Sequence, residues 1–157
     1  MDGVFAALEG LPFVEAIRFS RWGYAAVNAA HILGLALVVG STVPLNLRLL
    51  GIAWKSVDRA DVVRVLSATA ASGLALAVCA GLILFATRAT EYGGSDVLWV
   101  KLALVACGTT SAVIAHVRYG WTLTYAPRGA CTVHAVISLT CWVGALICGR
   151  LIAFTLP

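Results

Sequence analysis

Residues 22–45, WGYAAVNAAHILGLALVVGSTVPL, decide the fold because they form a long apolar run without Asp, Glu, Lys or Arg. A helix needs about 20 mostly apolar residues to cross a hydrocarbon core about 30 Å thick. Residues 66–87, 98–117 and 131–155 meet the same requirement. The 157 residues are 61% hydrophobic and only 11% charged, which is not typical of a soluble domain. The sequence therefore predicts a single integral membrane domain over residues 1–157, with an all-α fold of four transmembrane helices packed as a bundle.

Residues 4–19, VFAALEGLPFVEAIRF, precede the first span and are too short to cross a membrane. Pro12 also interrupts this segment, and its apolar residues alternate with Glu9, Glu15 and Arg18. This pattern predicts a short amphipathic helix that lies in the headgroup region. No positive segment followed by an apolar core and a small-residue cleavage site is present, so we do not expect a secretion signal.

The flanks of the four spans differ in positive charge. The loops after the first and third spans carry six cations, which are Arg48, Lys55, Arg59, Arg64, Arg118 and Arg128. Because cytoplasmic loops are enriched in Lys and Arg, these loops are predicted to face the cytoplasm and both termini the opposite side. The net charge of +4 is predicted to attract the cytoplasmic side of the protein to anionic lipid, and no nucleic-acid partner is expected.

Small residues recur at the spacing that lets membrane helices approach closely. Gly73, Ala77 and Gly81 are four residues apart in the second span, and the first span supplies Ala30, Gly34 and Gly40. Helices in lipid associate through such residues because apolar burial alone does not drive them together. These positions are predicted to form the packing surfaces of the bundle.

Ionisable residues within the spans are candidates for function, because each costs about 2.5 kcal/mol or more to insert. Asn28 and His31 share one face of the first span. Three cations are expected near the same depth, namely Arg88, Lys101 and Arg150, with Glu91 as the acid beside them. This excess of positive charge predicts a bound anion, such as the propionates of haem or a quinone head group. The alternative is that each cation extends separately to the lipid headgroups.

His116 and His134 flank one loop at matching depth, near the other membrane surface. Low-spin haem iron takes axial nitrogen ligands in a pocket of low dielectric constant, so the two residues are a second candidate metal or haem site. Ligands on adjacent antiparallel helices must be splayed apart to admit a porphyrin, and His31 is free of this difficulty. The alternative is that both histidines simply meet water and phosphate at the interface.

The five cysteines lie within or at the ends of the spans and form no C-x-x-C motif, which argues against a disulfide framework. They are Cys79, Cys107, Cys131, Cys141 and Cys148. Cys141 and Cys148 extend a stripe from His134 along one face of the fourth span. Sulfur and imidazole in a line are suited to pass Cu(I), whereas buried cysteines more often serve as small apolar residues.

Several stretches together resemble an uncharacterised bacterial family of four-helix integral membrane proteins, over nearly the whole chain. They are HILGLALVVGSTVPLNLRLLG (31–51), GLILFATRATEY (81–92), VLWVKLALVACG (97–108), IAHVR (114–118) and CWVGALICGRLIAF (141–154). In that family an Asp-Leu-Arg-Leu-Leu-Gly stretch follows the histidine of the first span. Asn46 stands here where the Asp is expected, which removes a carboxylate from the predicted cytoplasmic side.

A more distant likeness connects the chain with two better-understood groups, the bacterial copper-resistance membrane protein family and the haem-binding protoporphyrinogen oxidase family. Both have a histidine in the first span and a lysine that opens a later span. His31 and Lys101 match these positions, and the Trp99-Val-Lys101 stretch is a loose match to the lysine motif. The resemblance implies haem ahead of copper as cofactor, and a place in the bacterial inner (cytoplasmic) membrane. The distribution of positive charge adds the expectation that the termini are periplasmic.

The resulting prediction is a membrane protein that binds b-type haem and serves as a redox or electron-transfer component, or as an oxidoreductase. His31 is the predicted iron ligand, and Asn28 is expected to orient its ring. The other predicted cofactor-binding residues are Lys101, Arg150, Arg88, His116 and His134, and the predicted metal ligands are His31, His116 and His134. The lipid bilayer, a quinone, and a partner redox protein or a second copy of the chain are the expected partners. The alternatives are a copper or other metal-ion handling protein that uses His134, Cys141 and Cys148, and a cofactor-free structural subunit.

Overall fold

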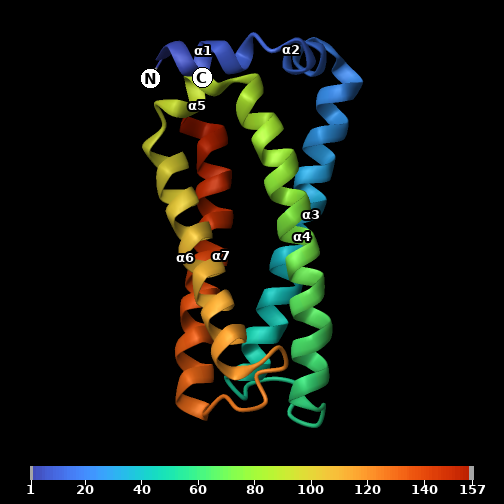
Figure 1. Cartoon of the computed structure of the whole chain (residues 1–157), viewed down its shortest axis with the longest axis vertical. Helices are drawn as coiled ribbons and strands as arrows, with labels where there is room; N and C mark the ends of the chain where they lie inside the picture. The colour runs from blue at the N-terminus through green and yellow to red at the C-terminus, as the bar shows by residue number, and fades with distance from the viewer. Residues whose placement is uncertain (1, 156–157) are drawn as a thin grey trace.

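The computed structural model describes residues 2–155, which form an all-helical structure with four long helices (Figure 1). The long helices are α3 (Arg21–Leu49), α4 (Arg59–Thr87), α6 (Asp96–Tyr119) and α7 (Arg128–Thr155). Each of the four contains a stretch long and apolar enough to cross a membrane. The shorter helices are α1 (Asp2–Glu9), α2 (Pro12–Phe19) and α5 (Ala89–Gly93). The predicted all-α bundle of four spanning helices is thus confirmed.

The long helices α3, α4 and α6 begin at capping side chains that lie outside the apolar runs. The Ser20 hydroxyl accepts a hydrogen bond from the Gly23 amide at 3.0 Å, and the Asp58 carboxylate accepts one from the Ala60 amide at 2.6 Å. Such caps stabilise a helix start because the first amides have no partner within the helix. The helices are accordingly longer than the predicted spans, and α4 begins at Arg59 rather than near residue 66.

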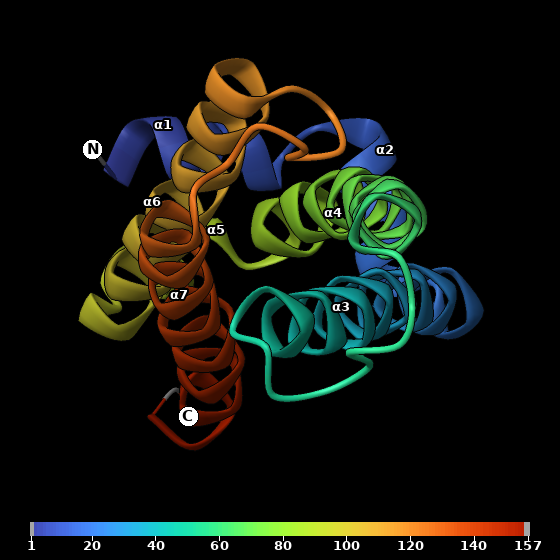
Figure 2. The same cartoon turned by 90° about the horizontal axis from the view of Figure 1, so that it is seen from below.

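The bundle consists of two helix pairs, α3 with α4 and α6 with α7, and α3 also packs against α7 (Figures 1 and 2). Small residues bring α3 and α4 together, as predicted. A Cβ atom added at Gly34 would come within 2.6 Å of the Ala77 nitrogen and 2.8 Å of the Gly73 oxygen. The backbones of α3 and α4 therefore touch at this point, and a side chain larger than hydrogen does not fit at Gly34.

The two pairs meet most closely at the end of the bundle that carries the α3–α4 and α6–α7 loops. A buried apolar cluster lies there, formed by Leu45, Val63, Ala115, Leu123, Ala126 and Cys131. The Asn46 side-chain amide donates a hydrogen bond to the Ser138 hydroxyl at 2.8 Å and so joins α3 to α7. The Arg59 guanidinium donates a hydrogen bond to the Thr124 carbonyl at 3.1 Å and so joins the start of α4 to the α6–α7 loop.

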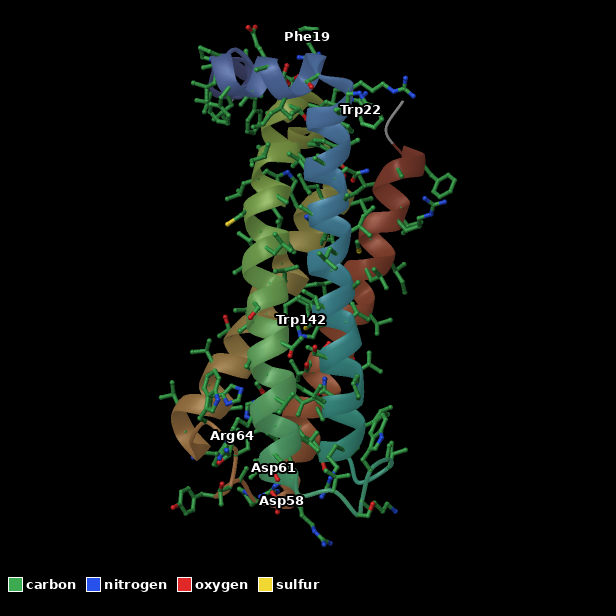
Figure 3. All side chains as sticks on the ribbon, turned by 90° about the vertical axis from the view of Figure 1, so that its right-hand side faces the viewer. Phe19, Trp22, Asp58, Asp61, Arg64 and Trp142 are labelled. Atoms are coloured by element: carbon green, nitrogen blue, oxygen red, sulfur yellow. The ribbon has the colours of Figure 1, made fainter. Side chains whose placement is uncertain are left out.

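The outer faces of the long helices are apolar and exposed, as the side chains Leu82 and Val117 illustrate with exposed fractions of 64% and 81%. Soluble proteins rarely expose a continuous apolar surface of this kind. The labelled charged residues Asp58, Asp61 and Arg64 gather at one end of the molecule, and the aromatic residues Phe19 and Trp22 lie at the other (Figure 3). The chain is a small multi-pass membrane protein whose helix sides contact lipid.

The N-terminal segment forms two helices, where the sequence predicted one over residues 4–19. α1 and α2 lie across the end of the bundle where both termini are found (Figure 1). Pro12 at the start of α2 explains the break, since proline fits the first turn of a helix and not its interior. The Phe5 ring packs edge-on against the Phe85 ring, with centroids 5.9 Å apart, and lies directly over Gly93. These contacts fix α1 to the end of α4 and to α5.

Glu9 makes the polar contacts that attach α1 to α5. The ionisation of the Glu9 carboxylate is predicted to control the strength of this attachment. The Glu9 carboxylate accepts hydrogen bonds from the Thr90 hydroxyl at 2.6 Å and from the Thr90 amide at 2.7 Å. These bonds, led by the one from the hydroxyl, lower the pKa of Glu9 below its ordinary value of 4.5. Because the folded pKa is the lower one, the contribution to stability is complete above about pH 4.5 and is lost as the pH falls through the folded pKa.

Hydrogen exchange at the Thr90 amide is the measurement that checks this prediction. We expect its protection factor, corrected for the intrinsic exchange rate at each pH, to fall as the pH is lowered below about 4.5. The variant Glu9→Gln is expected to show lower protection at neutral pH and no such fall, because its amide does not titrate. A wild-type protection factor that stays constant through the acidic range would contradict the prediction.

Candidate functional site

His31 is half-buried between α3 and α4. Its Nδ1 atom lies 2.8 Å from the carbonyl oxygen of Ala77. A carbonyl only accepts hydrogen bonds, so Nδ1 must carry the hydrogen and donate it. In a neutral imidazole this tautomer leaves a free lone pair on Nε2, for which no hydrogen bond is found within residues 2–155. The α3–α4 contact thereby fixes the orientation of the His31 ring and leaves Nε2 without a partner among these residues.

Gly81 provides the space for the His31 ring on α4. A Cβ atom at this position would come within 3.0 Å of the ring Cε1 and 3.2 Å of Nδ1. Gly34, one turn further along α3, lets the two backbones approach so that the ring reaches the Ala77 carbonyl. The small residues predicted to pack the bundle therefore also position the histidine.

Lys101 lies near the start of α6, where its side chain is half-buried and runs over Gly149 of α7. Its ammonium nitrogen is 3.4 Å from the position that a Cβ atom would take at Gly149. No Asp or Glu in the described part of the chain forms an ion pair with it. The positive charge of Lys101 is near enough to interact with His31, so the two predicted residues share one region of the bundle.

The other predicted cations are placed differently. Arg88 forms an ion pair with Glu91 where α4 passes into α5, so its charge is neutralised within the chain. Arg150 is exposed and lies over the Phe154 ring, with its guanidinium carbon 4.8 Å from the ring centroid. Among the three cations predicted for this layer, Lys101 is the one that is half-buried without a carboxylate.

Asn28 is exposed on α3, about one turn before His31. It was expected to orient the imidazole ring through the second ring nitrogen. The Ala77 carbonyl takes this role in the structure. Main-chain acceptors carry no sequence signal of their own, so the sequence does not predict this partner.

His116 and His134 bind separate neighbours at the loop end of the bundle. The Nδ1 atom of His134 lies 2.9 Å from the Ser111 hydroxyl, which joins α7 to α6. The His116 ring packs against the Trp121 ring of the following loop, with centroids 4.8 Å apart and the ring planes tilted by 30°. Within residues 2–155, no group of three or more His, Cys, Asp or Glu side chains is placed to hold a metal ion. A shared metal site at these two histidines therefore stays a prediction.

An open apolar groove of about 380 Å³ lies between α3 and α7. Its lining residues are Ile32, Leu35, Ala36, Val39, Gly40 and Leu146. Ile32, the residue after His31, is one of these residues, whereas His31 itself does not line the groove, and almost all of the groove surface is apolar. It offers contact to a flat or extended apolar molecule and no polar group that would bind an ion.

The chain matches no protein-family model, no curated protein and no solved structure. The family resemblance drawn from the sequence motifs therefore stays a prediction.

Proposed function

We propose that this multi-pass membrane protein binds b-type haem through His31 and serves as a redox or electron-transfer component. The observation that carries the proposal is the hydrogen bond from His31 Nδ1 to the Ala77 carbonyl, which leaves the Nε2 lone pair free. Histidines that bind metals usually donate their other ring N–H in this way, because the bond fixes the tautomer and the ring orientation. A polar ring atom without a partner at membrane depth is costly, and a bound ligand offsets that cost.

The residues around His31 suit a haem group in two further respects. The groove between α3 and α7, which Ile32 helps to line, is apolar, as a porphyrin face requires. Lys101 supplies a positive charge without a carboxylate partner, which is suited to a haem propionate or to a quinone head group. Bound haem would supply a one-electron iron couple, and the chain would supply the ligand, the apolar surround and the charge that holds the propionate.

His31 is the only ligand that we assign to the iron. His116 and His134 lie towards the opposite end of α6 and α7 and already contact Trp121 and Ser111. The chain would then supply one nitrogen ligand to the iron, and a small molecule or a group from a partner would supply any second ligand. This arrangement is consistent with a component that works beside a second redox protein or a second copy of the chain.

The proposed location is the bacterial inner membrane, with both termini on the periplasmic side. The loop end of the bundle carries Lys55, Arg59 and Arg64, as expected for the cytoplasmic face. His31 and Lys101 lie in the halves of α3 and α6 that are nearer the end of the bundle where both chain termini are found. Electrons would therefore exchange with a quinone or a partner protein near the periplasmic side.

Replacement of Lys101 tests the proposed propionate contact. We expect Lys101→Met to weaken haem binding to the purified protein by about 10- to 100-fold, the value of one hydrogen bond to a charged group. Lys101→Arg is expected to retain most of the affinity because the charge remains. The matched control is Arg150→Gln, which removes an exposed cation on the outer face and is expected to have little effect. Equal haem affinity in wild type and Lys101→Met, measured by absorbance titration, would contradict the role of Lys101.

A second candidate function is that of a cofactor-free structural subunit. The same His31 bond favours it, because the ring already joins α3 to α4 without any ligand. On this account the wild-type protein shows no absorbance change when haem is added, and His31→Ala only weakens the helix contact. The haem titration of the wild-type protein separates the two functions.

A further inference from the structure

A second open groove, of about 410 Å³, lies at the loop end of the bundle, where α3, α4 and the loop between them meet. Its lining includes Pro44 of α3, Trp54 and Val57 of the α3–α4 loop, and Asp61 of α4. The walls are almost wholly apolar, and Asp61 is the acid among the lining residues. The haem proposal uses none of these side chains, so the groove needs an explanation of its own.

The Asp61 carboxylate is available to a group from outside the chain. Asp61 lies in the first turn of α4, at the end of the bundle where the labelled charged residues gather (Figure 3). Among the described residues, 2–155, no side chain or amide forms a hydrogen bond or an ion pair with it. The neighbouring Asp58, by contrast, is occupied in capping α4. Arg64, the next cation along α4, does not line the groove.

The α3–α4 loop holds Trp54 at the groove in a conformation that large residues rarely adopt. Trp54 has a φ angle of 50°, in the left-handed region. On one side of it, the Ala53 amide donates a hydrogen bond to the Leu47 carbonyl at 3.3 Å, and on the other the Arg48 guanidinium donates to the Val57 carbonyl at 2.7 Å. These bonds fix the loop around Trp54. Backbone strain of this kind is often found at ligand-binding sites.

The groove leads from the polar end of α4 towards its apolar middle. Asp61 lies near the start of the helix, and Val62, Val65 and Leu66 continue the lining over the next turn. Val65 is exposed on the outer surface of the bundle, which the article of lipid around the helices covers in a membrane protein. A ligand that fits therefore has a positive group at Asp61 and an apolar chain that follows α4 into the hydrocarbon layer.

We propose that this groove binds a phosphatidylethanolamine-type lipid through its ammonium group. The ammonium donates hydrogen bonds to the Asp61 carboxylate and lies against the electron-rich face of the Trp54 ring. One acyl chain follows Val65 and Leu66, and the exposed Lys55 is available to the phosphate of the same lipid. A lipid is favoured over a water-soluble amine because the apolar walls extend from the headgroup level into the span.

Selective retention of lipid by the purified full-length protein tests the site. The protein is equilibrated in detergent micelles with equal amounts of phosphatidylethanolamine and phosphatidylglycerol that carry the same acyl chains. After affinity capture, mass spectrometry quantifies each lipid retained per protein. We expect Asp61→Asn to lower the ratio of bound phosphatidylethanolamine to phosphatidylglycerol by about five- to tenfold relative to wild type, the value of one charge-assisted hydrogen bond at a partly exposed site. Asp61→Glu keeps the charge and should keep most of this preference.

Asp96→Asn is the matched control, because it removes the same charge from an exposed position in the first turn of α6, at the other end of the bundle. It should leave the lipid ratio unchanged. Trp54→Leu keeps an apolar side chain but removes the aromatic face, and it should lower the ratio by about two- to fivefold. Circular dichroism spectra equal to that of wild type show that the variants retain the fold.

Two results would overturn the proposal. The first is a wild-type ratio no higher than that of Asp61→Asn, which would show that lipid only surrounds the helices without selection at this groove. The second is displacement of bound phosphatidylethanolamine by an equimolar amount of dodecylammonium, which would show that the site takes a free amine. Neither result depends on haem, so the test is independent of the proposed function.

Discussion

Replacement of Gly34 by alanine is expected to lower the free energy of unfolding by about 1–3 kcal/mol or more, the cost of overpacking a well-packed interface. The added methyl group would overlap the main chain of α4, at 2.6 Å from the Ala77 nitrogen and 2.9 Å from the Ala77 Cα. Main-chain atoms cannot rotate away as a flexible side chain can, so α3 and α4 must separate. Separation would also move the His31 ring away from the Ala77 carbonyl.

Gly40→Ala is the matched control, because it lies on the same helix with nothing within 4 Å of an added Cβ atom. There, alanine should be neutral or stabilising by up to about 1 kcal/mol, since it is the better helix former. Circular dichroism in mixed micelles with increasing denaturing detergent gives the free energy of unfolding of all three proteins. Equal losses in Gly34→Ala and Gly40→Ala would contradict the close α3–α4 contact.

The second large effect is expected at His31, where alanine should abolish haem binding. The variant removes the proposed iron ligand, and within residues 2–155 the other two histidines lie towards the loop end of the bundle. A reduced-minus-oxidised absorption spectrum of the purified protein measures the change. His134→Ala removes an imidazole bound to Ser111 and is the control, which should keep the wild-type band. Loss of the band in His134→Ala alone would place the haem at the other end of the bundle.

The spanning helices were predictable because one property, continuous apolarity over about 20 residues, is enough to specify them in lipid. Their ends were not, because capping residues such as Ser20 and Asp58 extend the helices into polar sequence. The N-terminal segment shows a similar limit. Pro12 correctly indicated an interruption. The segment nevertheless forms two helices instead of the expected one, with α1 ending before Pro12 and α2 beginning at it.

The packing residues of the site followed from sequence because small residues four apart mark close helix contacts, as Gly34, Gly73 and Ala77 confirm. The distribution of charge was harder to foresee. Arg88 and Glu91 are three residues apart and pair locally, a spacing that the sequence does display. The placement of Arg150 outward and Lys101 inward depends on the rotation of each helix within the bundle, which no local pattern specifies.

Rescue by free imidazole tests most directly whether His31 binds the iron or only joins two helices. The protein is His31→Gly, loaded with haem in the presence or absence of imidazole, and the measurement is the reduced-minus-oxidised spectrum. If His31 Nε2 is the ligand, the variant lacks the wild-type band, and added imidazole restores it by filling the space that the ring vacates. A wild-type band in His31→Gly without imidazole, or a colourless wild-type protein after haem loading, would contradict the account.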